Sequence, residues 1–128
     1  MILNERSEKN LVGVNPDLVR VVRKAALLLA DGPLGFVVTE GLRTKERQEQ
    51  LVAAGASKTM NSRHLTGHAV DLAATVGGEI RWDWPLYRTL ADLMKSAAEI
   101  EKVDIVWGGD WLTFRDGPHF ELRRTKYQ

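Results

Sequence analysis

Two short stretches of this 128-residue chain hold all three of its histidines and the residue types of a metal site. The first, residues 62–71, reads Ser-Arg-His-Leu-Thr-Gly-His-Ala-Val-Asp, and the second, residues 116–119, reads Asp-Gly-Pro-His. Imidazole and carboxylate groups bind zinc in hydrolases, where three protein ligands leave one position open for water. The two stretches therefore predict a small zinc hydrolase with a further carboxylate beside the metal.

Spacing separates the expected ligands from the remaining histidine. His64 and His68 are four residues apart, which would place both rings on one face of a helix, but Gly67 lies between them and a strand pattern follows. A turn at Gly67 would instead fold His64 back towards Asp71, and His119 would join from a neighbouring strand. We expect His64, Asp71 and His119 to bind the metal. His68 is expected beside this group or in contact with substrate, with a purely structural role as the alternative.

A second carboxylate and an arginine complete the expected chemistry. Asp116 stands three residues before His119, so it can lie over the metal without binding it and accept a proton from its water. The alternative is an ordinary turn residue, because Asp-Gly is a common turn dipeptide. Arg43 lies between an expected strand and a helix, where it can bind a substrate carboxylate or stabilise an oxyanion. A surface arginine in a charged stretch is its alternative.

Short helices and strands must position these residues. Apolar residues at helical spacing, with capping residues before them, predict three helices: residues 16–30, 44–54 and 85–102. Their expected core stripes include Leu18, Val21, Val22, Ala25, Leu28, Leu29, Leu86, Leu90, Leu93, Met94, Ala97 and Ile100. Runs rich in β-branched and aromatic residues predict four strands: residues 35–40, 68–74, 104–107 and 119–122. The uneven order predicts an α+β fold, a single compact domain with a small, mainly antiparallel sheet packed with about three helices.

Composition excludes several classes of protein. A hydrophobic fraction of 44% and a charged fraction of 27% are typical of a globular domain, and the absence of cysteine excludes thiolate metal sites and disulfides. A net charge of +1 argues against dedicated nucleic-acid binding. The longest apolar run is far shorter than the ~20 residues of a membrane span, and no secretory signal is visible. We read the basic residues 123–126 as a solvated tail, with contact to an anionic polymer as the alternative.

The motifs resemble those of a known family. S-x-H-x-x-G-x-A-x-D at residues 62–71, followed by D-x-x-H at residues 116–119, is similar to the pattern of the zinc peptidases of bacterial cell walls. These comprise D-alanyl-D-alanine carboxypeptidases and dipeptidases, and the L-alanyl-D-glutamate endopeptidases of phage endolysins. W-G-G-D-W at residues 107–111, and an aspartate where the dipeptidases have glutamate, resemble the endopeptidase branch. The resemblance covers about residues 15–122.

The resemblance implies a role for each motif residue. His64, Asp71 and His119 would bind Zn²⁺ and Asp116 would be the catalytic base. Arg43 and Ser62 would match family residues that serve the substrate or its oxyanion. We further assign two residues to substrate contact, namely His68 and Trp107, although Trp107 and Trp111 can equally belong to the core. The implied reaction is hydrolysis of an amide bond in the stem peptide of peptidoglycan.

We therefore expect a monomeric L-alanyl-D-glutamate endopeptidase that acts on peptidoglycan and binds no nucleic acid. Without a signal peptide, it would accumulate in the host cytoplasm and act as a phage or prophage endolysin once the membrane is breached. Residues 1–128 are expected to be the catalytic domain alone, with no separate wall-binding module. The alternatives are a D-alanyl-D-alanine carboxypeptidase and a non-catalytic, zinc-bearing cell-wall-binding domain. The first would release free D-alanine, and the second would cut nothing.

Overall fold

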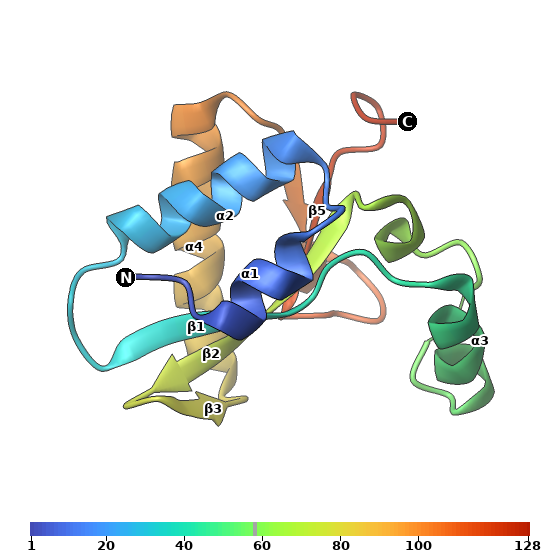
Figure 1. Ribbon diagram of the computed structural model, residues 1–128, viewed down its shortest axis with the longest axis horizontal. Coiled ribbons are helices and arrows are strands. Elements are labelled where there is room, and N and C mark those ends of the chain that lie inside the picture. The colour runs from blue at the N-terminus through green and yellow to red at the C-terminus, as the bar shows by residue number, and fades with distance from the viewer. Residues whose placement is uncertain (58) are drawn as a thin grey trace.

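The computed structural model describes residues 1–57 and 59–128, and in these it shows four α-helices and one five-stranded antiparallel sheet (Figure 1). The helices are α1 (Glu5–Leu11), α2 (Pro16–Leu28), α3 (Lys45–Ala53) and α4 (Trp84–Glu101). The strands are β1 (Leu34–Glu40), β2 (Ala69–Val76), β3 (Glu79–Arg81), β4 (Ile105–Trp107) and β5 (His119–Leu122). Two short 3₁₀ helices are η1 (Arg63–Thr66) and η2 (Gly108–Asp110). The fold is α+β, as expected from the sequence.

Strand β2 is the centre of the sheet. β1 pairs along one of its edges, and the other edge is shared by β5 and β3, which pair with residues 69–71 and 74–76 respectively. β4 then adds to the far side of β5. The register places Asp71 opposite Glu40 on one neighbour and opposite His119 on the other. Three polar residues therefore stand in one row across three adjacent strands.

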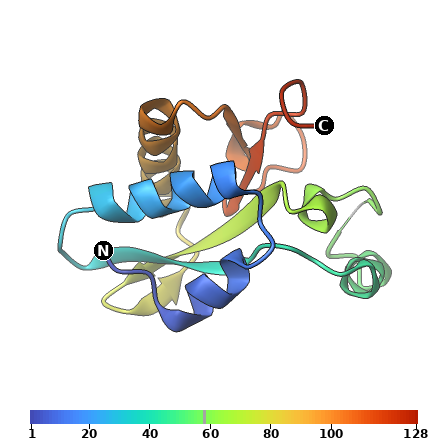
Figure 2. The same ribbon diagram turned by 45° about the horizontal axis from the view of Figure 1, so that its top comes forward.

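Helices α2 and α4 cross each other and bury the main core (Figures 1 and 2). Asn15 caps α2 by accepting a hydrogen bond from the amide of Asp17, as its place before Pro16 predicts. The prediction that Leu28 and Ile100 belong to the core is wrong, because they are 42% and 53% exposed. Each lies in the last turn of its helix. The buried stripe of α4 instead comprises Tyr87, Leu90, Ala91, Met94, Ala97 and Ala98.

Helix α1 and strand β3 were not predicted, because neither has an apolar pattern. α1 buries only Ser7 and Leu11, and it is capped by Asn4. Its polar side chains nevertheless cover the free edge of β1, where the Val38 amide donates to Ser7 Oγ at 2.9 Å and Asn10 Nδ2 donates to the Val38 carbonyl at 2.8 Å. Such cover protects an edge strand from pairing with another chain.

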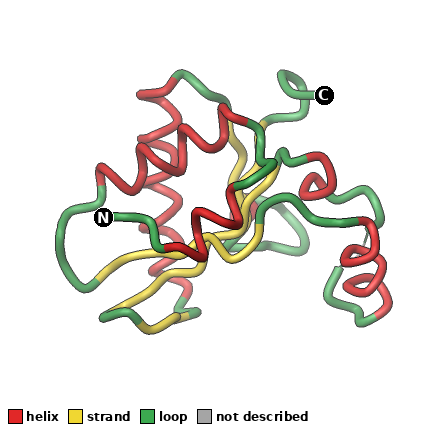
Figure 3. The backbone as a smooth tube through the Cα atoms, in the orientation of Figure 1, coloured by secondary structure: helices red, strands yellow, loops and turns green. Residues whose placement is uncertain are grey.

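Helix α3 and η1 stand apart from the α2–α4 layer, beyond the end of the sheet where β1 finishes and β2 begins (Figures 1 and 3). Thr44 caps α3 by accepting a hydrogen bond from the amide of Arg47, as expected. Within the described part of α3 the one buried residue is Gln48. The segment thus projects polar surface beside the sheet end, where the row of polar residues lies. Among the described residues, no helix has the length and apolar character needed to cross a membrane.

Candidate active site

Three side chains from three elements converge at this end of the sheet: His64 from η1, Asp71 from β2 and His119 from β5. Each residue offers one candidate ligand atom, and these three atoms all lie within 4.8 Å of one another. His64 Nε2 and His119 Nδ1 are each 3.2 Å from the same atom, Asp71 Oδ1. Both histidines are buried, and Asp71 is partly exposed. The group could hold a metal ion.

Local backbone structure presents each of these side chains. Asp71 and His119 are register partners on adjacent strands, so the sheet itself brings them together. Ser62 caps η1, with its Oγ 3.2 Å from the amide nitrogen of His64. Gly67 ends η1 in the left-handed region, with φ at 74°, a conformation that favours glycine. The turn that the sequence places at Gly67 is therefore what faces His64 towards Asp71.

Hydrogen bonds on the far side of the His64 and His119 rings determine which ring nitrogen presents a lone pair to Asp71. His64 Nδ1 lies 2.8 Å from the carbonyl oxygen of Gly41 and donates to it, which leaves Nε2 as an acceptor in the neutral ring. His119 Nε2 lies 2.9 Å from Glu121 Oε1, and donation there leaves Nδ1 as an acceptor. Three acceptor atoms then face one another, an arrangement that needs a cation or protons between them. Two imidazoles and a carboxylate, with each ring held from behind, fit zinc well.

The ionisation of the group reflects the same geometry. Burial opposes a charge on His119, but the hydrogen bonds with Asp71 and Glu121 outweigh it and raise the pKa of His119 to about 9. Burial likewise opposes a charge on Asp71, yet the hydrogen bonds from His119 and His64 hold its pKa well below the ordinary value. The site therefore stabilises positive charge around a carboxylate, as a cation-binding site must.

Glu121 is a site residue that the sequence analysis missed. It lies two residues after His119 on β5, so both side chains are on the same face of the strand, and both are buried. Arg63 Nε and Arg124 Nε lie 3.9 Å and 3.8 Å from Glu121 Oε2. Burial would raise the pKa of Glu121, but His119 and the two arginines lower it overall. A glutamate two residues beyond a ligand histidine in a strand is the signal that could have identified it.

Asp116 lies on the loop before β5, and it is partly exposed. Its carbonyl accepts from the amide of His119 at 3.2 Å, and its own amide donates to the carbonyl of Gly108 at 3.1 Å. A Cβ at Gly108 would lie 2.5 Å from the Asp116 carbonyl oxygen, so only glycine permits this approach. Burial and the negative charge of Asp71 raise the pKa of Asp116 above its ordinary value. A carboxylate of raised pKa is a better proton acceptor at neutral pH.

Arg43 reaches the site, but protein groups already hold its guanidinium. Nε and Nη2 donate to the two carboxylate oxygens of Glu40 at 2.7 and 2.8 Å, and Nη1 donates to Gln48 Oε1 at 2.7 Å. Nη2 also lies 3.9 Å from Asp71 Oδ2. The side chain is only 8% exposed. Its geometry fits the positioning of Glu40 and Asp71 better than the expected binding of a substrate carboxylate.

Two residues expected to contact substrate are not among the described residues that line the site cavity. Trp107 is 4% exposed, donates from Nε1 to the carbonyl of Gly117 at 2.7 Å and stacks on Trp84, so it belongs to the core and supports the loop that carries Asp116. His68 lies 2.6 Å from Thr66 Oγ1 through Nδ1 and is not among the described residues that line the site cavity. Trp107 is the last residue of β4, where side chains alternate between buried and partly exposed, so it faces the core.

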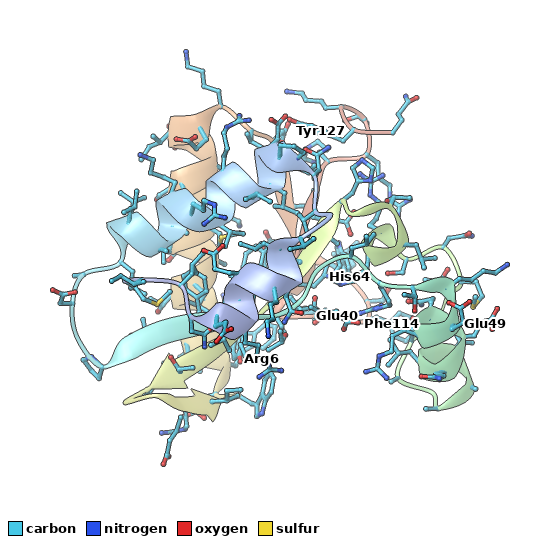
Figure 4. All side chains as sticks on the ribbon, in the orientation of Figure 1. Arg6, Glu40, Glu49, His64, Phe114 and Tyr127 are labelled. Atoms are coloured by element: carbon cyan, nitrogen blue, oxygen red, sulfur yellow. The ribbon has the colours of Figure 1, made fainter. Side chains whose placement is uncertain are left out.

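An open cavity of about 830 Å³ lies over the donor group. It reaches from His64 and Asp116 to Phe114 on the loop before β5 and to Leu51 on α3. Figure 4 shows Glu40 and His64 at the end of the sheet, with Phe114 between them and α3. Trp111 also lines the cavity, with its ring 5.1 Å from that of His119. The donor group is therefore reached through this open cavity.

An α+β domain with a His–His–Asp group whose histidines are buried, beside a carboxyl of raised pKa and beneath an open cavity, is typical of metal-dependent hydrolases. Comparison with known proteins gives the family. Residues 1–123 match the model of the phage L-alanyl-D-glutamate peptidase family, and the chain belongs to that family.

Named relatives agree with this assignment. The chain is 32% identical over 127 residues to the L-alanyl-D-glutamate peptidase of Escherichia phage T5, spanning 96% of this chain and 90% of that one. It is 38% identical over 91 residues to the L-alanyl-D-glutamate peptidase of Listeria phage A118, but spans only 31% of that protein's length. The crystal structure of the Serratia marcescens L-Ala D-Glu endopeptidase ChiX has a TM-score of 0.88 and 47% identity, covering 96% of this chain and 90% of that one.

Proposed function

We propose that this chain is a zinc-dependent L-alanyl-D-glutamate endopeptidase that cuts the stem peptide of peptidoglycan. Family membership supports the bond that is cut, because relatives named for this activity match almost the whole chain. The observation that carries the zinc dependence is the pair of imidazole nitrogens, each 3.2 Å from Asp71 Oδ1. Two histidines and an aspartate are a ligand set of catalytic rather than structural zinc, which normally has four protein ligands.

In this proposal His64 Nε2, Asp71 and His119 Nδ1 hold the metal. Bound zinc would polarise the scissile carbonyl and lower the pKa of a water molecule towards ~7. The Gly41 carbonyl and Glu121 keep the two rings in the tautomers that direct a lone pair inward. Ser62 acts indirectly, because it caps the 3₁₀ helix that presents His64.

Asp116 acts as the general base and acid in the proposed mechanism. Its raised pKa suits removal of a proton from the attacking water at neutral pH and delivery of that proton to the departing amine. The contacts of its main chain with Gly108 and His119 hold the backbone of Asp116 beside the donor group. Arg43 holds Glu40 and contributes positive charge near Asp71 and the carbonyl under attack.

We place the activity in phage lysis, with residues 1–128 acting as one catalytic unit. The family description and two phage relatives support this setting. The protein would wait in the host cytoplasm and reach the wall after the membrane is breached. Expression in intact bacteria should leave the wall undamaged until the membrane is permeabilised, and release of the protein from intact cells would contradict this.

The test of the proposed function is digestion of purified peptidoglycan by the wild type and by D116A, with zinc content measured for both. New amino-terminal glutamate should appear only with the wild type, while both proteins hold about one zinc per chain. Free D-alanine would instead identify a carboxypeptidase. A zinc-loaded wild type that releases no termini would leave only a binding domain.

A further inference from the structure

The cavity over the donor group is lined by both signs of charge. Its acidic residues are Glu40, Asp71, Asp116 and Glu121, and its arginines are Arg43, Arg63, Arg115 and Arg124. An anionic substrate group entering here meets the acids unless an arginine is free to receive it. Such a group would bind at an arginine that is not already paired with a carboxylate.

Three of the four arginines already have partners. Arg43 forms the two-pronged ion pair with Glu40. Arg63 is only 9% exposed, and it donates to the carbonyls of Leu122 and Tyr127 at 3.1 and 2.7 Å. Its Nε also lies 3.9 Å from Glu121 Oε2. Arg124 lies 3.8 Å from that same oxygen. Their charges are used mainly to hold the site together.

Arg115 differs from these three. It is exposed and lines the cavity, and within the part of the chain that the structure describes it forms no ion pair with a carboxylate. It directly precedes Asp116, and it follows Phe114, which has a φ of 51° in the left-handed region. Non-glycine residues rarely adopt this conformation, and where they do the surrounding structure specifies it. The backbone therefore turns immediately before Arg115 and places it at the cavity beside the proposed base.

The substrate bond dictates an anion on the leaving-group side. In an L-alanyl-D-glutamate bond the amine of glutamate is in the scissile amide. At most one of its two carboxyl groups can continue the stem peptide, so the other is free unless it is amidated. That carboxylate lies within a few bonds of the amine that receives the proton. It would approach Asp116, whose negative charge opposes it.

We propose that Arg115 binds the free carboxylate of the substrate glutamate and makes the enzyme prefer glutamate over its carboxamide form. This rests on the proposed function. A guanidinium matches a carboxylate with two parallel N–H donors, and the planar fork gives geometric selectivity that a point charge lacks. A primary amide has no negative charge and presents one oxygen acceptor, so it forms a weaker pair with Arg115. Arg115 is thus a specificity-determining residue next to the proton-transfer residue.

Two stem peptides test the proposal, identical except that the remaining glutamate carboxyl is free in one and a primary amide in the other. The ratio of kcat/KM for acid over amide is measured with the zinc-loaded wild type, R115Q, R115K and R124Q. A hydrogen-bonded ion pair corresponds to a wild-type ratio of about 10 to 100. R115Q should bring the ratio to within about twofold of one, mainly by raising KM for the acid. R115K should keep part of the preference, and R124Q should keep most of it.

Each result decides a different point. A wild-type ratio near one, or equal losses on both peptides in R115Q, would overturn the role of Arg115. Loss of the preference in R124Q but not in R115Q would also overturn it, because the carboxylate would then bind at Arg124. If the wild type cuts neither peptide nor peptidoglycan, the proposed function itself fails, and the two failures are distinguishable.

Discussion

Glu121 Oε1 lies 2.9 Å from His119 Nε2, directly behind the ring whose other nitrogen faces Asp71. A carboxylate that accepts from a ligand histidine fixes the tautomer and makes the ring a stronger ligand. Arg63 and Arg124 in turn lie near the second oxygen of Glu121. The proposed ligand is thus supported by charged groups from β5, η1 and the segment after β5.

Replacement of Glu121 should weaken metal binding without abolishing the fold. Loss of such a carboxylate typically lowers metal affinity about 10- to 100-fold. We therefore expect E121Q to bind zinc at least tenfold more weakly than the wild type in competition with a chromogenic chelator. E79Q, on the exposed strand β3, is the matched control and should bind zinc as the wild type does. Equal affinities for wild type and E121Q would show that Glu121 does not support the ligand.

Removal of the metal should abolish activity and lower stability. A chelator should eliminate the release of amino-terminal glutamate, and added Zn²⁺ should restore it. Because the ion binds the folded donor group, zinc at about 100 times its dissociation constant should stabilise the fold by about 2.7 kcal/mol. Thermal unfolding with and without zinc measures this. Unchanged activity and Tm after complete removal of metal would refute a catalytic metal at His64, Asp71 and His119.

The D116N variant should separate proton transfer from metal binding. Its amide cannot accept the proton, so kcat should fall by about 10²- to 10⁴-fold. Asp116 is outside the donor group, so zinc content should stay near that of the wild type. D110N serves as the control, because Asp110 pairs with Lys95 on the protein surface. A kcat within a few-fold of the wild type would exclude Asp116 as the general base.

Gly108 should tolerate substitution far less than Gly32 does. A Cβ at Gly108 would lie 2.5 Å from the Asp116 carbonyl oxygen and 3.0 Å from His119 Cβ, so G108A must displace both site residues. We expect at least a tenfold loss of kcat/KM, with a lower Tm. G32A is the matched control, since nothing lies within 4 Å of a Cβ at Gly32 and its φ is not left-handed. Equal activity of the two variants would show that the Asp116 loop adapts freely.

The contact between Tyr127 and Asp17 should contribute stability that depends on pH. Tyr127 Oη donates to Asp17 Oδ2 at 2.6 Å, and this bond together with the Arg20 pair lowers the pKa of Asp17. A carboxyl whose pKa is lower in the folded state stabilises the fold above its unfolded pKa of about 3.9 and loses this effect as the pH falls. D17N should therefore lower Tm more at pH 7 than at pH 3. An equal difference in Tm at both values would contradict this linkage.

Local sequence patterns sufficed for the elements that carry the core. Helix α2 begins after Asn15 and helix α3 after Thr44, as their capping residues predict. Strand β5 has the predicted bounds. Helix α1 was not predictable in this way, because its stability depends on polar contacts with the edge of β1, which lies far along the chain.

The sequence motifs predicted the residues of the donor group, but not the contacts that surround them. The grouping of His64 with Asp71 follows from the glycine turn between them, which is a local signal. The place of Glu40 opposite Asp71 depends on strand register instead. Arg43 is only three residues after Glu40, so their pairing is local, but the sequence does not show that Glu40 stands beside the donor group. The burial of Trp107 likewise depends on its stacking with Trp84 from α4.

The pairing of β2 with β5 also makes the site depend on a long-range contact. Asp71 and His119 are 48 residues apart in the chain, and they meet only when these two strands align. Closing a loop of this length costs entropy, which the antiparallel pairing and the buried core must offset. A ribosome-bound chain that has not yet exposed His119 cannot assemble the donor group. The donor group is therefore a property of the folded domain, and no shorter N-terminal part of the chain contains it.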